Sequence, residues 1–427
     1  MVFIKICVLT LGCKVNTYES EVIKNQFIET GDELVNIKDN PDVVIINTCT
    51  VTNAADAKSR KLIRSAKKSN EKAIVVVCGC SSEQYKQELL PLGIDILIGN
   101  ENKNEVFNLV KSYLKNQKQI IKFDNQESFI ETKVDNYTSQ TRAFVKIQDG
   151  CNNYCSYCII PFVRGRQRSK DLNTAFEEIK ALVNNGFKEI VLTGIHTGSY
   201  GAGKDYNLIT LIKMISKLEN LLRIRISSIE ITEIDNEFLE ELANNPKICD
   251  HLHIPLQSGS DQVLKAMNRK YTIQEYIAKI KQIRTVRPLI NLTTDLILGF
   301  PTESEEDFKI TLDNLKELSF SKIHAFPYSE RNGTVAADLK TIVNDLEKKL
   351  RVKKVLELSQ ELEIKYYQKF IGKSLELLIE EVTGDNSIGH TSNYIKVNIQ
   401  KKLTKNEQIN VIINTIDETG VQAVLSK

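Results

Sequence analysis

The sequence predicts an α/β protein built from a parallel α/β domain, a partial (βα)6 barrel and a small β-barrel at the carboxyl terminus. Three observations support this prediction. Val- and Ile-rich runs alternate with amphipathic segments in the first quarter of the chain, and the same alternation resumes with a longer period at residue 143. The last residues, 371–427, contain only strand-like runs separated by turns.

The amino-terminal domain is predicted over residues 1–117. Apolar runs at 4–11, 42–48, 73–79 and 94–99 have the composition of buried parallel strands. The segments between them show helical periodicity and end at Gly or Pro, so the strands are expected to be joined by right-handed crossovers. Residues 115–141 are polar and poor in strand patterns, which predicts a linker.

The central barrel is predicted over residues 138–368. Strand patterns begin at residues 143, 189, 222, 251, 290 and 322, and each is followed by a helical segment. In such barrels the working residues lie beyond the carboxyl ends of the strands. A charged helix is expected at 344–370, and strand-like runs at 374–384, 393–399, 409–416 and 421–427 predict the small terminal barrel.

The composition is that of an ordinary soluble protein, with 41% apolar and 26% charged residues. No apolar run approaches the ~20 residues that span a bilayer, and the first residues lack signal-peptide features, so we expect a cytoplasmic protein without a membrane partner. In a reducing compartment the nine cysteines favour metal or redox chemistry over disulfides. A net charge of +2 neither requires nor excludes nucleic acid.

Three cysteines, named here the outer cysteines, stand just past the first three predicted strands: Cys13, Cys49 and Cys80. The carboxyl ends of parallel strands meet at one edge of a sheet, so these thiols are expected to converge. Three converging thiolates predict a metal or iron–sulfur site. Burial as a small apolar side chain explains a single cysteine equally well, and it fits Cys7 and Cys78, which fall inside strands.

A second set, the central cysteines, follows the first strand of the predicted barrel with the spacing C-x3-C-x2-C: Cys151, Cys155 and Cys158. A structural zinc site needs four ligands, and no Cys or His occurs between Cys158 and His196. A four-iron cluster held by three thiolates leaves one iron open to another ligand. The pattern therefore predicts a [4Fe–4S] cluster that binds a cofactor.

The spacing of the central cysteines resembles that of radical S-adenosylmethionine enzymes. The resemblance implies that the open iron binds the methionine part of S-adenosylmethionine and that one electron from the cluster generates a 5′-deoxyadenosyl radical. An aromatic residue before the last cysteine and the strand-end residues of the barrel are the candidates for holding this cofactor. A turn or a capped helix is the alternative for each strand-end residue. The candidates are Tyr157, Thr193, Gly194, Ser228, Glu230, Gln257, Asp295 and Gly299.

A series of long segments, in order and nearly end to end, resembles the methylthiotransferase family. They are LTLGCKVNTYESE, INTCTVTNAAD, VVCGCSSEQ, CNNYCSYCIIPFVRGRQRS, LTGIHTGSYG, HLHIPLQSGSDQVLKAMNRKYT, TDLILGFPTESEEDF and HAFPYSERNGTVAA. The resemblance implies an amino-terminal cluster domain, a radical core and a terminal TRAM domain that contacts RNA. It also implies two [4Fe–4S] clusters, one on the outer and one on the central cysteines, with S-adenosylmethionine as methyl donor and radical source.

The residues Gly-Cys-Lys-Val-Asn around Cys13 resemble the branch of the family that acts on threonylcarbamoyladenosine at tRNA position 37. The isopentenyladenosine branch usually has Gly-Cys-Gln-Met-Asn there, and the branch that modifies an aspartate of a ribosomal protein has Gly-Cys-Pro-Lys-Asn. We expect tRNA, through its anticodon loop, as substrate, a donor such as flavodoxin or ferredoxin, and a monomer. An iron–sulfur scaffold or electron-transfer protein is the alternative, and it predicts no 5′-deoxyadenosine.

Two groups of basic residues are candidates for binding RNA phosphates. One group lies on the predicted helix after the second strand: Lys58, Arg60, Lys61, Arg64, Lys67 and Lys68. The other, Arg164, Arg166 and Arg168, follows the central cysteines. A solvated helix face and arginines that bind the cofactor are the alternatives. Tyr394 in the terminal barrel is a candidate to stack on a base, or else a core residue.

Overall fold

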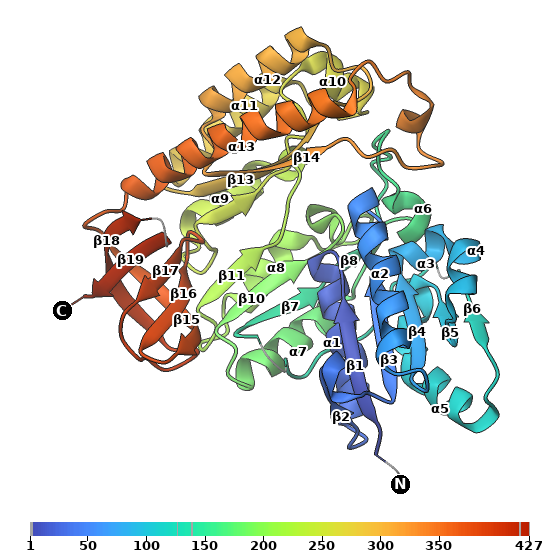
Figure 1. Cartoon of the computed structure of the whole chain (residues 1–427). Coiled ribbons are helices and arrows are strands. Elements are labelled where there is room, and N and C mark those ends of the chain that lie inside the picture. The colour runs from blue at the N-terminus through green and yellow to red at the C-terminus, as the bar shows by residue number, and fades with distance from the viewer. Residues whose placement is uncertain (1–2, 126, 138–139, 418–419, 427) are drawn as a thin grey trace.

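The amino-terminal part of the computed structural model is a six-stranded sheet in the order β2-β1-β3-β4-β5-β6, with every neighbouring pair parallel (Figure 1). The structure describes residues 3–125, 127–137, 140–417 and 420–426. The strands are β1 (Lys5–Thr10), β2 (Glu33–Leu34), β3 (Val43–Thr48), β4 (Ile74–Gly79), β5 (Ile96–Ile98) and β6 (Ile120–Lys122). The helices are α1 (Lys14–Ile28), α2 (Asn53–Ser69), α3 (Cys80–Gln84), α4 (Lys86–Leu89) and α5 (Val106–Asn116).

Apolar side chains fill both faces of this sheet, as the unbroken Val and Ile runs predict. Helices α1 and α5 cover one face, where Phe27 and Val110 pack on the strands. Helix α2 covers the other face with Ile63 and Ala66. The predicted four strands are confirmed. The short edge strands β2 and β6 were missed, and β6 lies in the stretch that the sequence assigned to a linker.

The central part contains six parallel strands in two three-stranded sheets, β11-β10-β7 and β12-β13-β14. The strands are β7 (Arg142–Lys146), β10 (Glu189–Thr193), β11 (Arg223–Ile226), β12 (His251–His253), β13 (Asn291–Leu298) and β14 (Lys322–Pro327). A parallel bridge between Ile224 and Ile248 joins the two sheets. The predicted partial barrel of six strands is therefore confirmed, with a break in its ladder between β11 and β12.

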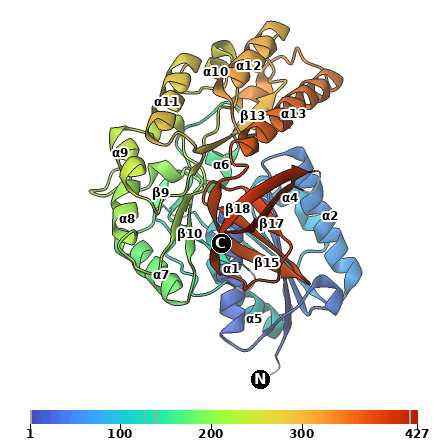
Figure 2. The same ribbon diagram turned by 90° about the vertical axis from the view of Figure 1, so that its left-hand side faces the viewer.

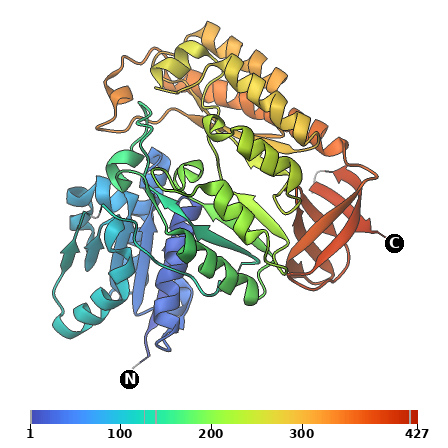
Figure 3. The same cartoon turned by 180° about the vertical axis from the view of Figure 1, so that it is seen from behind.

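Helices cover the outside of these sheets, one after another along the molecule (Figure 2 and, from behind, Figure 3). They are α6 (Ile160–Arg164), α7 (Leu172–Asn184), α8 (Leu208–Ile215), α9 (Asn236–Asn244), α10 (Asp261–Ala266), α11 (Ile273–Val286), α12 (Glu305–Leu318) and α13 (Asp345–Gln368). The side chains of Asp171, Thr272 and Ser304 cap the first turns of α7, α11 and α12. None of the helices in the described ranges is both long and apolar enough to span a membrane.

The carboxyl-terminal part is a closed barrel in the order β15-β16-β17-β19-β18. The strands are β15 (Ser374–Thr383), β16 (Asn386–Thr391), β17 (Lys396–Ile399), β18 (Gln408–Asp417) and β19 (Gly420–Leu425). The small barrel is confirmed. Strand β16 was missed because its sequence, NSIGHT, has the polar residues and glycine of a turn rather than an apolar run.

This terminal barrel packs directly on the central barrel (Figure 1). Arg223 donates to the carbonyl oxygens of His390 and Glu376, and Arg225 donates to that of Ser392. The ring of Tyr394 lies under the guanidinium of Arg225, 4.6 Å from its centre, and stacks on the His390 imidazole at 4.8 Å. Tyr394 is half-buried and helps to hold two parts of the chain together, but it is not part of the apolar core of the terminal barrel, and its stacking on a base stays a prediction.

Candidate functional site

The outer cysteines occupy the carboxyl ends of β1, β3 and β4, which are neighbours in the sheet. Cys13 directly precedes α1, Cys49 follows β3, and Cys80 is the first residue of α3. Gly12 has φ +98°, and a Cβ there would lie 2.9 Å from the Cys49 sulfur. The turn before α1 therefore requires glycine so that Cys49 can come close to it.

Cys78 and Cys80 are separated by the strand-ending Gly79, and they lie in different environments. Cys78 is buried in the core between the sheet and α1, and its thiol is 3.8 Å from the carbonyl oxygen of Ile46. Cys80 lies beyond the strand, against Ile159 and Val163 of the segment that follows the central cysteines. The Asn100 side-chain amide lies 3.9 Å from the Cys80 sulfur, so this thiol lies beyond the strand end, whereas that of Cys78 faces the core.

We predict that Cys80→Ala removes the iron bound by the outer cysteines, about four per chain, and that Cys78→Ala retains it. The reason is that only Cys80 stands at the strand end where Cys13 and Cys49 converge. Iron content after anaerobic reconstitution, with the Mössbauer spectrum of each variant, measures the difference. Loss of iron in Cys78→Ala with retention in Cys80→Ala would contradict the assignment.

The central cysteines lie in the loop between β8 (Gln148–Asp149) and α6, and β8 pairs with β9 (Arg168–Ser169). Gly150 has φ +70°, and a Cβ there would lie 2.0 Å from the carbonyl oxygen of Arg166. The close approach of these two loop strands therefore requires glycine. The amide of Cys151 donates to the carbonyl oxygen of Gly165, so the strand pair fixes the start of the cysteine loop.

Hydrogen-bond donors surround the central sulfurs. The amide of Asn153 donates to the Cys151 sulfur at 3.4 Å, and the Arg269 guanidinium donates to the Cys155 sulfur, also at 3.4 Å. His196 Nδ1 lies 3.9 Å from the Cys151 sulfur, and its Nε2 lies 2.6 Å from a Glu233 carboxylate oxygen. Donors of this kind stabilise thiolate sulfurs and tune iron–sulfur clusters.

Neither Arg269 nor His196 was predicted from the sequence as a contact of the central cysteines, and the reason differs for the two. His196 lies three residues past the end of β10, so its position on the working edge of the barrel was available as a signal. Arg269 follows α10, at no strand end. Only the folded chain brings it to Cys155, where it also forms an ion pair with Glu230.

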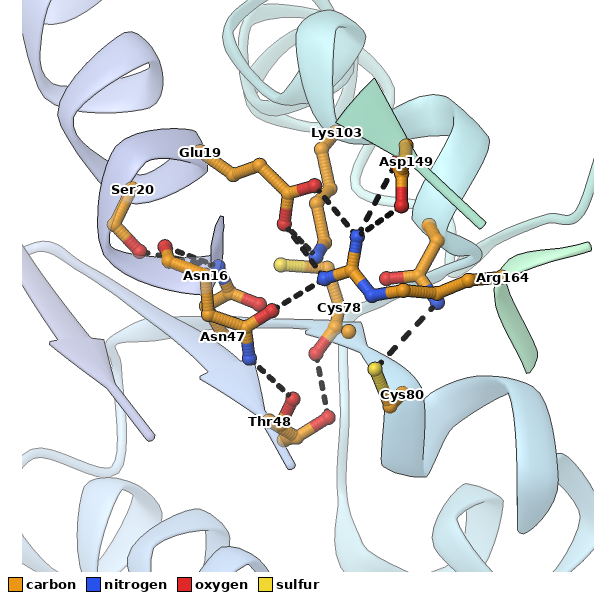
Figure 4. Close-up of polar contacts among 12 residues, drawn as sticks. Asn16, Glu19, Ser20, Asn47, Thr48, Cys78, Cys80, Lys103, Asp149 and Arg164 are labelled. Carbon is orange, nitrogen blue, oxygen red and sulfur yellow. Dashed lines mark hydrogen bonds and ion pairs between the residues drawn. The ribbon is translucent and has the colours of Figure 1, made fainter. Parts of the chain in front are cut away.

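A buried network of charged side chains joins the two cysteine-bearing parts (Figure 4). Arg164 donates to Glu19 at 2.9 Å, to Asp149 at 3.0 Å and to Asn16 at 2.6 Å. Glu19 also pairs with Lys103 at 2.5 Å and Lys146 at 2.8 Å. Burial alone would raise the pKa of Glu19, but these three cations hold it well below its usual range.

The same network corrects one expectation about RNA binding. Arg164 is buried, and Arg168 forms an ion pair with Glu101 at 2.7 Å, so neither guanidinium presents itself to a phosphate. Arg166 alone of this group is exposed. On α2 the side chains of Lys58, Lys61, Arg64 and Lys68 are exposed, whereas Lys67 pairs with Asp95. The basic residues of α2 therefore remain candidates for binding RNA phosphates, whereas Arg164 and Arg168 do not.

Both cysteine sets fit iron–sulfur clusters chemically. All six thiols are free, and around the outer set the buried Thr50 Oγ1 and Ser81 Oγ have no hydrogen-bond partner in the described part of the chain. These hydroxyls are available to donate to cluster sulfurs. Among the described residues no three ligand side chains are close enough for a single metal ion. A four-iron cluster binds each thiolate on a different iron, so its ligands need not converge as closely.

A cavity of about 230 Å³, named here the reaction cavity, lies beside Cys158 of the central set. Val51 and Thr52, just past Cys49, form one wall, and Tyr157 and Cys158 form another. The remaining lining is mostly apolar: Ile159, Ile160, Ile297, Phe326, Pro327 and Tyr328, with Gln257, Asp295 and Ser329 as polar residues. The cavity therefore adjoins Cys158 of the central set and the segment that follows Cys49 of the outer set, and its lining is mostly apolar.

Contacts across this cavity hold its walls together. The buried pair Arg331 and Asp56 lies at 2.5 Å, and the Asn53 amide donates to Ser329 Oγ at 3.0 Å. Both contacts join the start of α2 to the segment after β14. The amino-terminal domain is thereby fixed against the open edge of the central barrel.

The predicted cofactor contacts fall into two groups. Tyr157, Gln257 and Asp295 line the reaction cavity. The others do not line it: Thr193, Gly194, Ser228, Glu230 and Gly299. Thr193 is buried and donates to its own strand, and a Cβ on Gly194 would lie 2.9 Å from Gln148 Oε1.

Two of the second group have partners near the cysteines or at a turn. Glu230 reaches the central set through its ion pair with Arg269. Gly299 has φ +67°, and its amide donates to Glu303 at 3.0 Å. Ser228 is half-buried at the end of β11. These placements leave the direct cofactor contacts of this group as predictions.

Comparison with known proteins matches the chain to two family models and to several relatives. Residues 145–315 match the radical SAM superfamily model, and residues 5–99 match that of an uncharacterised protein family, UPF0004. The chain is 41% identical to the threonylcarbamoyladenosine tRNA methylthiotransferase of Bacillus subtilis (strain 168), covering 91% of this chain and 88% of that protein. It is 36% identical to the tRNA-2-methylthio-N6-dimethylallyladenosine synthase of Clostridium novyi (strain NT), covering 87% and 84%.

Among solved structures, the chain resembles a radical S-adenosylmethionine methyltransferase from Kitasatospora setae with cobalamin and a [4Fe–4S] cluster bound. The TM-score is 0.58 at 12% identity, over 79% of this chain and 74% of that one. At this identity the likeness supports the fold alone.

Proposed function

Because this chain belongs to the methylthiotransferase family of radical S-adenosylmethionine enzymes, we propose that it adds a methylthio group to the adenine of N6-threonylcarbamoyladenosine at tRNA position 37. The observation that carries the proposal is that the reaction cavity is lined by Cys158 of the central set and by Val51 and Thr52, which follow Cys49 of the outer set. A transfer that needs a radical and a sulfur source requires these two sources to reach the same carbon. The 41% identity to a protein named for this substrate supports the choice of nucleoside.

We propose that the central cysteines hold the cluster that serves S-adenosylmethionine and that the outer cysteines hold a second [4Fe–4S] cluster. When bound, these groups supply an electron, a radical able to remove hydrogen from an unactivated adenine carbon, and the sulfur. The corresponding domains are residues 1–117 for the second cluster, 138–368 for the radical core and 371–427 for the TRAM domain. The enzyme is proposed to act as a cytoplasmic monomer with a donor such as flavodoxin or ferredoxin.

The side chains of the reaction cavity support radical chemistry in two ways. Apolar residues such as Ile297 and Phe326 limit the water that would otherwise surround a reactive intermediate. Gln257 and Asp295 offer polar atoms to a nucleoside in a wall that is otherwise apolar. Arg269 orients the Cys155 sulfur from outside the cavity lining.

The proposal is tested with three tRNAs of identical sequence that carry adenosine, threonylcarbamoyladenosine or isopentenyladenosine at position 37. We expect 2-methylthio product by nucleoside mass spectrometry only from the second, since the enzyme should require the modification already in place. Cells lacking the gene should lose the same nucleoside. Efficient reaction of the isopentenyl tRNA, or methylthio-aspartate in ribosomal protein only, would assign the chain to a sister branch.

A further inference from the structure

A second hollow, named here the polar chamber, lies inside the central barrel and adjoins the reaction cavity at Asp295, which lines both. Its volume is about 480 Å³. The lining comes from all three parts of the chain: Lys14 from the amino-terminal domain, Thr293 and His324 from the barrel strands, and Tyr394 from the terminal barrel. Its polar lining contrasts with the apolar walls of the reaction cavity.

Two lysines and two carboxylates line the polar chamber, and their pairing is unequal. Asp295 lies 3.3 Å from His253, and Glu363 lies 2.6 Å from Lys322, so each carboxylate lining the chamber has a cationic or imidazole partner. Lys14 has no ion pair or hydrogen bond among the described residues. Its half-buried ammonium therefore has no direct ion-pair partner, although the Asp295 carboxylate attracts it from farther away, and a bound anion would supply a direct partner.

The surroundings of the polar chamber carry an excess of positive side chains. Behind Tyr394, three arginines share two carboxylates: Arg225 lies 2.6 Å and Arg223 3.6 Å from Glu189, and Arg142 lies 3.3 Å from Glu380. The neutral imidazole of His251 and the hydroxyl of Thr293, 3.2 Å apart, add hydrogen-bonding groups without adding negative charge. The chamber thus suits a small group that combines a carboxylate with polar atoms.

We propose that the polar chamber binds the amino-acid arm on N6 of the substrate adenine, and that Lys14 pairs with its carboxylate. This inference rests on the proposed function, and it goes further by naming what selects the substrate. In adenine the reacting carbon and the carbon that bears N6 flank the same ring nitrogen. A base with that carbon in the reaction cavity therefore directs its arm toward a neighbouring space. An isopentenyl arm has no polar atoms and would leave the Lys14 ammonium without a direct partner.

The first experiment uses the wild-type enzyme and two anticodon stem-loops. One carries threonylcarbamoyladenosine, and the other carries the same arm with a carboxamide in place of the carboxylate. We expect kcat/KM for the carboxylate to exceed that for the carboxamide by about 10- to 100-fold, the range of a hydrogen bond to a charged group. Dissociation constants from fluorescence anisotropy, without turnover, should differ in the same direction.

The second experiment compares Lys14→Met with Lys24→Met, a lysine on the same helix that pairs with Glu21 and does not line the chamber. We expect Lys14→Met to bring the carboxylate-to-carboxamide ratio close to one, and Lys24→Met to leave it within about twofold. Since Lys14 adjoins Cys13, iron content is measured for each variant. If Lys14→Met loses iron, the chamber assignment is decided by the wild-type preference between the carboxylate and carboxamide stem-loops.

An equal preference of the wild-type enzyme for the two arms, with normal turnover of the natural one, would overturn the chamber assignment and leave the proposed function intact. A wild-type preference that persists unchanged in iron-replete Lys14→Met would overturn the role of Lys14. If the wild-type enzyme makes no methylthio product from the threonylcarbamoyl stem-loop but does so from another substrate, the proposed function itself is wrong.

Discussion

Replacing Cys151, Cys155 and Cys158 together with alanine is expected to halve the iron content, from about eight to about four per chain, and to abolish 5′-deoxyadenosine formation. The central thiols are the candidate ligands nearest the barrel wall of the reaction cavity, and Cys158 lines that cavity. The outer cysteines attach to a different sheet, so their iron should remain. Anaerobic reconstitution, iron analysis and chromatography of the reduced reaction mixture measure both effects.

Two matched variants show whether the loss is specific. Cys249→Ala removes a buried thiol that belongs to neither set and should keep all the iron. The triple change of Cys13, Cys49 and Cys80 should remove the other half of the iron and the methylthio product. Unchanged iron content in the central triple variant would refute the assignment of the central cysteines. So would 5′-deoxyadenosine formation at the wild-type rate.

The positions of the cysteines could be predicted because they depend on local pattern alone. A parallel strand needs an apolar run, and the residue after its end must lie at the shared edge of the sheet, as Cys49 and Cys80 do. The short edge strand β6 could not be predicted in this way. Its residues Ile120–Lys122 are only partly buried, and their strand structure comes from pairing with β5.

The partners of charged side chains were the main failure of the sequence analysis. Arg164, Arg166 and Arg168 form a regular pattern in the sequence, but their environments differ. Arg164 is buried, Arg168 pairs with Glu101, and only Arg166 of the three is exposed. Glu19 and Arg164 are far apart in the chain, and no periodicity indicates that they meet. Charge pairing across domains is decided by tertiary packing, so composition and spacing carry little information about it.

Replacing Arg164 with methionine is expected to destabilise the contact between the amino-terminal domain and the central barrel by about 3–5 kcal/mol. Methionine keeps much of the apolar stem but leaves Asp149 and the Asn16 amide oxygen without their buried guanidinium partner. Arg166→Met, two residues away and exposed, is the matched control and should change stability by no more than about 0.5 kcal/mol. The free energy of unfolding in urea and the hydrogen-exchange rates of the α1 and β8 amides are measured for the two variants and compared.

The functional consequence of Arg164→Met follows from the geometry of the reaction cavity. Val51 and Thr52 reach that cavity only if the amino-terminal domain stays docked. Arg164, like Lys146, bonds to Glu19 on one side of the junction and to Asp149 on the other. We therefore expect methylthio product per 5′-deoxyadenosine to fall at least about tenfold in Arg164→Met, because a loosened wall of 1 Å or so can cost that much. A double-mutant cycle with Glu19→Gln separates the pair's coupling from the loss of each charge. If Arg164→Met is clearly destabilised but forms as much methylthio product per 5′-deoxyadenosine as the wild type, sulfur delivery does not depend on this junction.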